Sequence, residues 1–197
     1  MQTKTKLIVA LSSLCSVLVI GIVMMGIAWA ATTQTIQSTI NITYTVSDVI
    51  VSVSANKYFS SNTPTAFTGG TNGTLTFSAT DASSTGVLST TDTALSSSND
   101  YVIYEYVFTN GGSNALSASL AIGSTTNLTT YVIAPTTTRK TSIYTGFTPS
   151  GYTASSSISA TNIAGGATAY AYVAMKVTDN SANASFSGTF TWTLQAA

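Results

Sequence analysis

Beyond residue 30, the segments at both ends of the chain alternate between apolar and polar residues with a period of two. From Thr35 to Val46 the apolar residues share one face, which only Ser38 interrupts, and polar residues occupy the other. Ser185–Leu194 repeats the pattern. Because successive side chains of a strand point to opposite faces, both segments are predicted to be strands with one buried face. No segment beyond residue 30 has helical periodicity, so the chain is predicted to be all-β.

Shorter alternating segments predict further strands between these two. The strongest is Tyr101–Thr109, which Asn110-Gly111-Gly112 ends before alternation restarts over 116–122, the pattern of a hairpin. The other predicted strands are 49–53, 75–79, 130–133, 141–145 and 169–178. About eight or nine short strands predict an antiparallel two-sheet sandwich, with jelly-roll connections as the expected form.

Breaks in the alternation indicate how the chain passes between these strands. The phase shifts by one residue near Ser47, which predicts a bulge or corner where the chain moves to another sheet or partner. The Ser/Thr/Gly-rich stretches 81–100 and 146–168 are predicted to be loops, although each is long enough to contain a further strand. The three prolines are expected in linking segments: Pro64, Pro135 and Pro149.

Residues 1–30 have the features of an export segment. Two lysines precede an uncharged apolar stretch, and Ala28 and Ala30 supply the small residues that a signal peptidase requires, which predicts cleavage before Ala31. The alternative is an uncleaved membrane anchor, because about 20 apolar residues can span a bilayer. In both cases residues 31–197 are expected outside the cell as one sandwich domain. The membrane is contacted only through residues 7–30, and only if they are not cleaved.

The chain lacks most of the side chains that perform catalysis. It has no histidine, and its single cysteine, Cys15, lies in the export segment. Ser-His-Asp and Cys-His arrangements are therefore excluded, and no spacing of acidic residues predicts a metal site. We expect no enzymatic activity, no cofactor and no metal; a hydrolase that pairs Glu105 with an aspartate is a remote third class. Residues 31–197 carry a net charge of −2, which argues against nucleic-acid binding.

Several motifs have both a structural and a functional interpretation. Tyr104, Tyr106 and Phe108 could form a sugar-binding platform, but clean alternation favours a core. Lys176 and Glu105, with a nearby asparagine, could form an isopeptide crosslink, although strand lysines usually face water. Asp179-Asn180 could hold a cation but is typical of a turn. Four sites fit the N-glycosylation pattern, which matters only in a host that glycosylates exported proteins: Asn41, Asn72, Asn127 and Asn183.

The apolar face of 35–46 must be buried, because each large apolar side chain contributes on the order of 1.5–3 kcal/mol as an upper bound. The strand either pairs within its own domain or inserts into the next subunit by β-strand addition. In the second case its anchors are expected to be Ile36, Ile40, Ile42 and Tyr44. A strand that projects from the body favours assembly, and a strand tucked into its own sheet favours a monomer.

Three motifs resemble the TasA/camelysin group of secreted biofilm-matrix proteins. They are the signal-peptide end Gly26–Ala31, the strand Tyr104–Gly112, and a final hairpin of Tyr172–Val177 with Phe186–Trp192. The resemblance implies a jelly-roll subunit that polymerises into extracellular fibres by exchange of its N-terminal strand. Thr32 and Thr33 depart from the aromatic-acidic start of that group, and the lysine- and aspartate-rich loops of its best-known members are missing.

The sequence thus predicts a secreted or cell-surface structural subunit that forms a homopolymer, with other matrix components as further partners. The alternative is a monomeric, membrane-tethered adhesion or glycan-binding module. In that case the loops 81–100 and 146–168 would contact the ligand.

Overall fold

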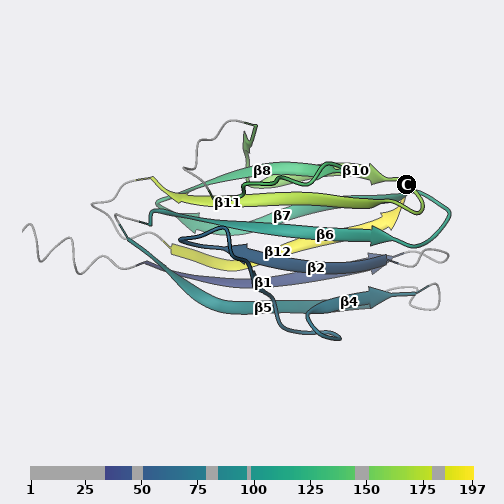
Figure 1. Ribbon diagram of the computed structural model, residues 1–197, viewed down its shortest axis with the longest axis horizontal. Helices are drawn as coiled ribbons and strands as arrows, with labels where there is room; N and C mark the ends of the chain where they lie inside the picture. Colours follow the sequence, from purple (N-terminus) through teal and green to yellow (C-terminus); the bar gives the residue numbers. More distant parts are fainter. Residues whose placement is uncertain (1–33, 46–50, 79–83, 97–98, 145–150, 179–184) are drawn as a thin grey trace, which may run out of the picture. The chain divides into compact units, whose positions relative to one another are not determined.

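Two β-sheets pack face to face in the computed structural model, which describes residues 34–45, 51–78, 84–96, 99–144, 151–178 and 185–197 (Figure 1). The described residues belong to one unit, Gln34–Ala197, separate from Met1–Thr33. None of them is helical. The prediction of an all-β two-sheet sandwich is therefore confirmed.

The first sheet, sheet A, has five strands. Their order across the sheet is β10 (Ser157–Ile163), β7 (Leu116–Thr126), β12 (Ser185–Ala196), β1 (Gln34–Thr45) and β5 (Ser84–Leu95). The N-terminal strand β1 is therefore an inner strand, and it runs parallel to β12 and antiparallel to β5. All other pairings between the described strands are antiparallel.

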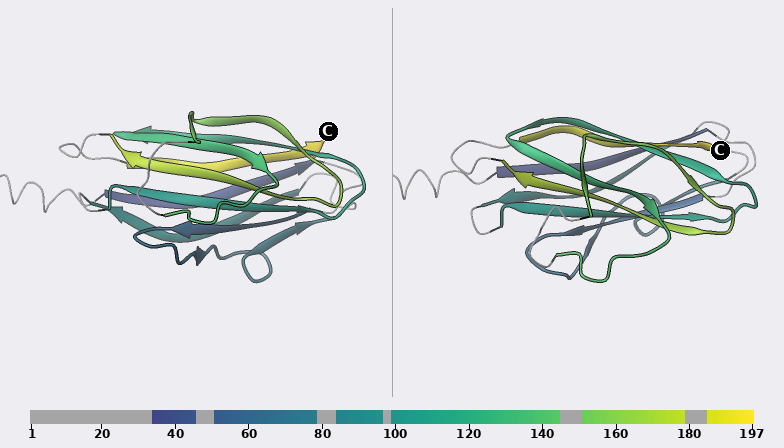
Figure 2. Two further views of the ribbon diagram at one scale, coloured as in Figure 1. Left: turned by 45° about the horizontal axis from the view of Figure 1, so that its top comes forward. Right: turned by 90° about the horizontal axis from the view of Figure 1, so that it is seen from above.

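The second sheet, sheet B, has seven strands. Its order is β3 (Thr65–Ala66), β2 (Val51–Tyr58), β6 (Tyr101–Asn110), β11 (Thr168–Val177), β8 (Leu128–Thr136) and β9 (Thr153–Ala154), with β4 (Thr74–Phe77) also paired to β2. Figure 2 shows the two layers from two further directions. The central strands β6 and β11 are buried along most of their length, because both of their faces are covered.

The main core lies between the sheets and contains a row of packed aromatic rings. Tyr104 and Tyr106 of β6 point inward and meet Phe190 and Trp192 of β12, with ring centroids 5.0 Å apart for Tyr104–Phe190 and 5.2 Å for Tyr106–Trp192. A second apolar cluster covers the outer face of sheet B and includes Tyr58, Ile103, Ile143 and Tyr172. Apolar burial on both faces explains why β6 has almost no polar side (Val102–Phe108).

The phase shift near Ser47 correctly predicted a change of sheet, because β1 belongs to sheet A and β2 to sheet B. The two predicted hairpins are wrong. β6 and β7 lie in different sheets, and so do β11 and β12, the pair that the family resemblance describes as a final hairpin. Turn residues mark only where a strand ends, and here the chain then crosses the sandwich instead of reversing within a sheet.

Other local predictions also need correction. The predicted loop 81–100 contains β5, and 146–168 contains β9 and β10. Residues 141–144 of the predicted strand 141–145 pair with no strand and cross the outer face of sheet B. Pro135 lies within β8 and not in a linking segment. Its ladder with β11 shifts register between Tyr170 and Tyr172, so the missing N–H falls at an irregularity.

Candidate functional site

The first candidate site is β1 together with the slot that it fills between β5 and β12, which we call the β1 groove. Ile40 lies between Phe190 of β12 and Leu88 of β5. Ile42 lies between Trp192 and Gly86. Backbone hydrogen bonds therefore hold β1 on both sides, and the edges of β12 and β5 that face it would be unpaired without it.

The inward face of β1 is completely buried in the part whose side chains are described. Ile36, Ile40 and Ile42 have no exposed surface and Ser38 has 1%. Ser38 is the polar residue that interrupts the apolar face, and its hydroxyl hydrogen-bonds the Tyr104 hydroxyl from the opposite sheet. Burial raises the pKa of Tyr104, so this phenol stays protonated and can donate or accept.

The structure gathers the predicted anchor residues in this groove, within a single copy of the chain. Tyr44 pairs with Leu194 and Ser84 through its backbone, and its side chain lies outside the described part. The strand is tucked into its own sheet, which is the arrangement that the sequence analysis associated with a monomer.

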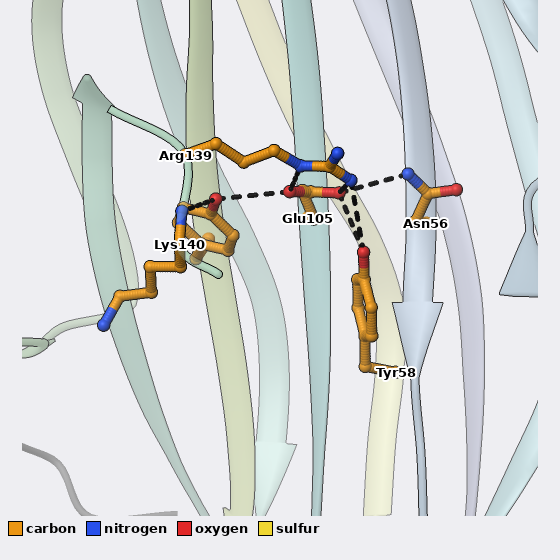
Figure 3. A network of polar contacts seen from close by, with 6 residues as sticks. Asn56, Tyr58, Glu105, Arg139 and Lys140 are labelled. Carbon is orange, nitrogen blue, oxygen red and sulfur yellow. Dashed lines mark hydrogen bonds and ion pairs between the residues drawn. The ribbon is translucent and has the colours of Figure 1, made fainter. Parts of the chain in front are cut away.

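The second candidate site is a polar network on the outer face of sheet B, centred on Glu105 (Figure 3). The Arg139 guanidinium binds both carboxylate oxygens, with Nε 2.8 Å from Oε1 and Nη2 2.9 Å from Oε2. Asn56 and the Tyr58 hydroxyl donate to Oε2 at 3.2 and 3.1 Å. The Tyr172 hydroxyl donates to Oε1 at 3.2 Å. A fully buried carboxylate thus has partners on both oxygens.

This network fastens the segment 137–144 across sheet B. Besides the ion pair, the Lys140 backbone N–H donates to the Tyr172 hydroxyl at 2.9 Å. Burial alone would raise the pKa of Glu105, but the hydrogen bonds from Arg139 and Asn56 and the charge of Arg139 outweigh it, so the pKa is lowered. Glu105 is therefore ionised at neutral pH and suited to holding a cation in place, not to donating a proton.

The network contains two of the three groups that the isopeptide hypothesis requires, since Asn56 lies beside Glu105. The cation there is Arg139, whose guanidinium is not a nucleophile. Lys176 lies opposite Tyr101, four residues along β6 from Glu105, and pairs with Asp100 at 3.3 Å. The Lys140 amino group points away from the carboxylate (Figure 3), toward the Tyr152 ring at 4.7 Å. The Lys176–Glu105 pairing is therefore wrong.

A hollow of about 440 Å³ lies beside this network. Aromatic, apolar and basic side chains line it: Tyr58, Asn62, Pro64, Arg139, Lys140, Thr141 and Ile143. Sequence reasoning overlooked Arg139, although an Arg-Lys pair in a chain with so few charges was the available signal.

The remaining predicted site residues have varied locations. Tyr104, Tyr106 and Phe108 are fully buried, so they form the core and not a surface platform. Asn72 and Asn127 are exposed at turns with positive φ, and Asn41 lies in mid-strand on β1. The cleavage residues Ala28, Ala30 and Ala31, together with Asn183 and Asp179-Asn180, lie outside the described residues.

The described residues include no group of three or more acidic, histidine or cysteine side chains that could hold a metal ion. The same residues contain no helix with the length and hydrophobicity needed to cross a bilayer. No family model matches the chain, and no curated protein matches it. The solved mu-homology domain of yeast delta-COP-I aligns with 82% of this chain and 95% of its own length, at 7% identity and a TM-score of 0.24. That similarity is too low to support any inference.

Proposed function

We propose that this protein is an exported structural subunit of an extracellular or cell-surface filament, and that subunits are linked by exchange of β1. The observation that carries the proposal is the position of β1, which is the first described strand in sequence and an inner strand of its sheet. Once residues 1–30 are cleaved off, β1 can leave its groove without threading the rest of the chain, because only 46–50 connects it to β2.

Exchange conserves the contacts that hold β1. A neighbour's β1 would meet the same two ladders and the same inward partners, so the closed and exchanged forms differ mainly in the linking residues and in entropy. The closed arrangement within one copy is therefore also the starting point for exchange. The resemblance to the TasA/camelysin group, which implies strand exchange, points the same way.

The scarcity of charge supports assembly as well. The chain has six basic and six acidic residues, and such a low charge weakens the repulsion that keeps sheet edges apart. The absence of histidine anywhere in the chain, and of cysteine beyond residue 15, supports a structural and not a catalytic role.

A second candidate function is a monomeric adhesion or glycan-binding module. The tucked β1 favours it, and so does the hollow beside Arg139, where aromatic and polar groups converge as in many ligand sites. The stretches 81–100 and 146–168 are less suitable than expected for ligand contact, because strands occupy much of both.

Electron microscopy tests the proposal with two chains, one that begins at Ala31 and one that begins at Val49. Filaments from the longer chain only are expected, and excess peptide 34–45 should shorten them by occupying free grooves. The chain that begins at Val49 lacks β1, so its fold is expected to need the added peptide. Adding peptide 34–45 to it is the control, and the peptide should restore the fold. Monodisperse particles from the longer chain across salt and pH would overturn assembly and leave the binding module.

A further inference from the structure

The inward face of β1 does not define its own register by apolar contacts alone. Three of its four described inward residues are isoleucines, Ile36, Ile40 and Ile42. A displacement by two residues keeps every side chain on its original face and places isoleucine on isoleucine at one position. Ser38 is the exception in this series.

We propose that Ser38 sets the register of β1, because its hydroxyl fits only the position opposite the Tyr104 hydroxyl. The two groups hydrogen-bond across the sandwich, and both side chains are buried. A strand displaced by two residues would bring Ile36 or Ile40 to the Tyr104 hydroxyl. It would move Ser38 either to the place of Ile40, between Leu88 and Phe190, or to the place of Ile36, opposite Thr93. In both cases the hydrogen bond that joins the two hydroxyls would be lost, which is unfavourable.

The surroundings of this pair make the position distinctive. Thr93 of β5 is buried beside the same phenol and lies opposite Ile36. Between Ile36 and Ser38 the β1–β5 ladder shifts register, so the groove is irregular at the level of the polar pair. Lys57 is buried against this part of β5 and donates to the Thr91 carbonyl at 2.8 Å. Ser38 thus enters a polar stretch of the groove.

If Ser38 sets the register between two subunits, its role rests on the proposed strand exchange. The effect of Ser38 on the register of β1 in the groove is the same whether the strand comes from the same copy or from another. Single buried polar residues fix register in this way in other assemblies, where they exclude displaced pairings.

Disulfide trapping tests the inference in the chain that begins at Ala31, which contains no native cysteine. Asn41 lies opposite Val87 of β5, so Asn41→Cys with Val87→Cys reports the native register. Asn41→Cys with Ser89→Cys, or with Thr85→Cys, reports a displacement by two residues in either direction. In the native register those diagonal pairs lie about 7–8 Å apart, which is too far for a disulfide.

In the otherwise native chain, the 41–87 disulfide should exceed either displaced disulfide by at least about tenfold, because two buried hydroxyls depend on the register. Ser38→Val should reduce that excess to about threefold or less. Ser38→Thr retains the hydroxyl and should preserve the native pattern, and Ile40→Val is the matched apolar control. Tyr104→Phe removes the other hydroxyl of the pair, and it is the variant to use for this test if Ser38→Val does not fold. An unchanged tenfold preference in Ser38→Val or in Tyr104→Phe would overturn the inference.

Non-reducing gel electrophoresis of these cysteine variants separates this inference from the proposed function. Disulfides confined to single chains, but only at 41–87, would overturn strand exchange and support the register rule. A ladder of linked chains with equal yields from all three cysteine pairs would support exchange and overturn the register rule.

Discussion

Arg139 forms a two-point ion pair with Glu105, whose carboxylate is completely buried although the Arg139 side chain is 51% exposed. The pair joins the irregular segment 137–144 to the central strand β6 of sheet B. A buried charged carboxylate is strongly destabilising once its partners are removed, so replacing the exposed Arg139 tests the ion pair.

Arg139→Met should lower the free energy of unfolding by about 1–3 kcal/mol, because it leaves Glu105 charged, buried and short of partners. The effect should not reach the larger values of fully buried pairs, since solvent screens the exposed guanidinium. Urea unfolding measures the change. Lys140→Met is the matched control, because its amino group makes no contact with Glu105 in the network.

A double-mutant cycle isolates the ion pair itself. Arg139→Met combined with Glu105→Gln should be less destabilising than the sum of the single changes, because the neutral amide no longer needs a cation. Strictly additive effects would mean that the pair contributes nothing beyond its separate contacts.

Acid should destabilise the protein partly through Glu105. Its pKa is lowered in the folded state, so the unfolded chain binds the proton more readily. The stabilisation is present above the ordinary pKa of about 4.3 and is lost as pH falls through the lowered folded-state value. Thermal unfolding from pH 6 to pH 3 should show a steeper loss of stability for the native chain than for Glu105→Gln. Parallel curves would contradict this assignment.

The isopeptide crosslink should be absent at Glu105. Its formation would join a lysine amine to the Asn56 carboxamide carbon and release ammonia, and the network supplies a guanidinium in place of that amine. Intact-mass spectrometry of the denatured chain that begins at Ala31 should give the full mass of residues 31–197. A mass lower by one ammonia, with a peptide linking Asn56 to a lysine, would show that this view of the network is wrong.

The strands were predictable to the extent that their burial is one-sided. β1 and β12 alternate because one face meets the core, and their ranges agree with the predicted segments within two residues. β5 was missed because most of its side chains are small or polar on both faces and because Gly86 breaks its apolar series. At Gly86 a Cβ would lie 2.5 Å from the Leu75 side chain, so Leu75 packs directly against this glycine.

The pairing of strands was not predictable from the same pattern. Alternation identifies which face of a strand is buried, but it does not say in which sheet the strand lies. β6 and β7 would each bury the same face whether they were placed in sheet A or in sheet B. The Glu105 network escaped prediction for a related reason. Its members come from four separated parts of the chain, and only folding brings Asn56, Glu105, Arg139 and Tyr172 together.

Ile40→Ala should destabilise the protein by about 2–5 kcal/mol, because Ile40 is fully buried between β5 and β12 and leaves a cavity. Its neighbour Thr39 faces outward, so Thr39→Ala should change stability by no more than about 0.5 kcal/mol. Chemical unfolding of both variants measures the difference. Equal effects would mean that β1 is not seated in the groove in solution.

Asn110→Ala should destabilise the protein by about 1–3 kcal/mol, because it leaves buried backbone groups without partners. Asn110 is fully buried where the chain leaves β6 for the other sheet. Its amide donates to the carbonyls of Asn114 at 2.9 Å and of Ile163 at 3.2 Å, and its Oδ1 accepts from the Gly112 N–H at 3.1 Å. The side chain therefore holds the crossover against the end of β10.

Asn114 provides the matched control for this prediction. It lies on the same crossover and is exposed. It accepts the hydrogen bond from Asn110 through its backbone carbonyl, which alanine retains. Asn114→Ala should therefore stay within about 0.5 kcal/mol of the native chain. Hydrogen exchange should show faster exchange around 110–116 in Asn110→Ala and not in Asn114→Ala. Equal protection in the two variants would mean that strand pairing alone, without the buried amide, fixes the passage between the sheets.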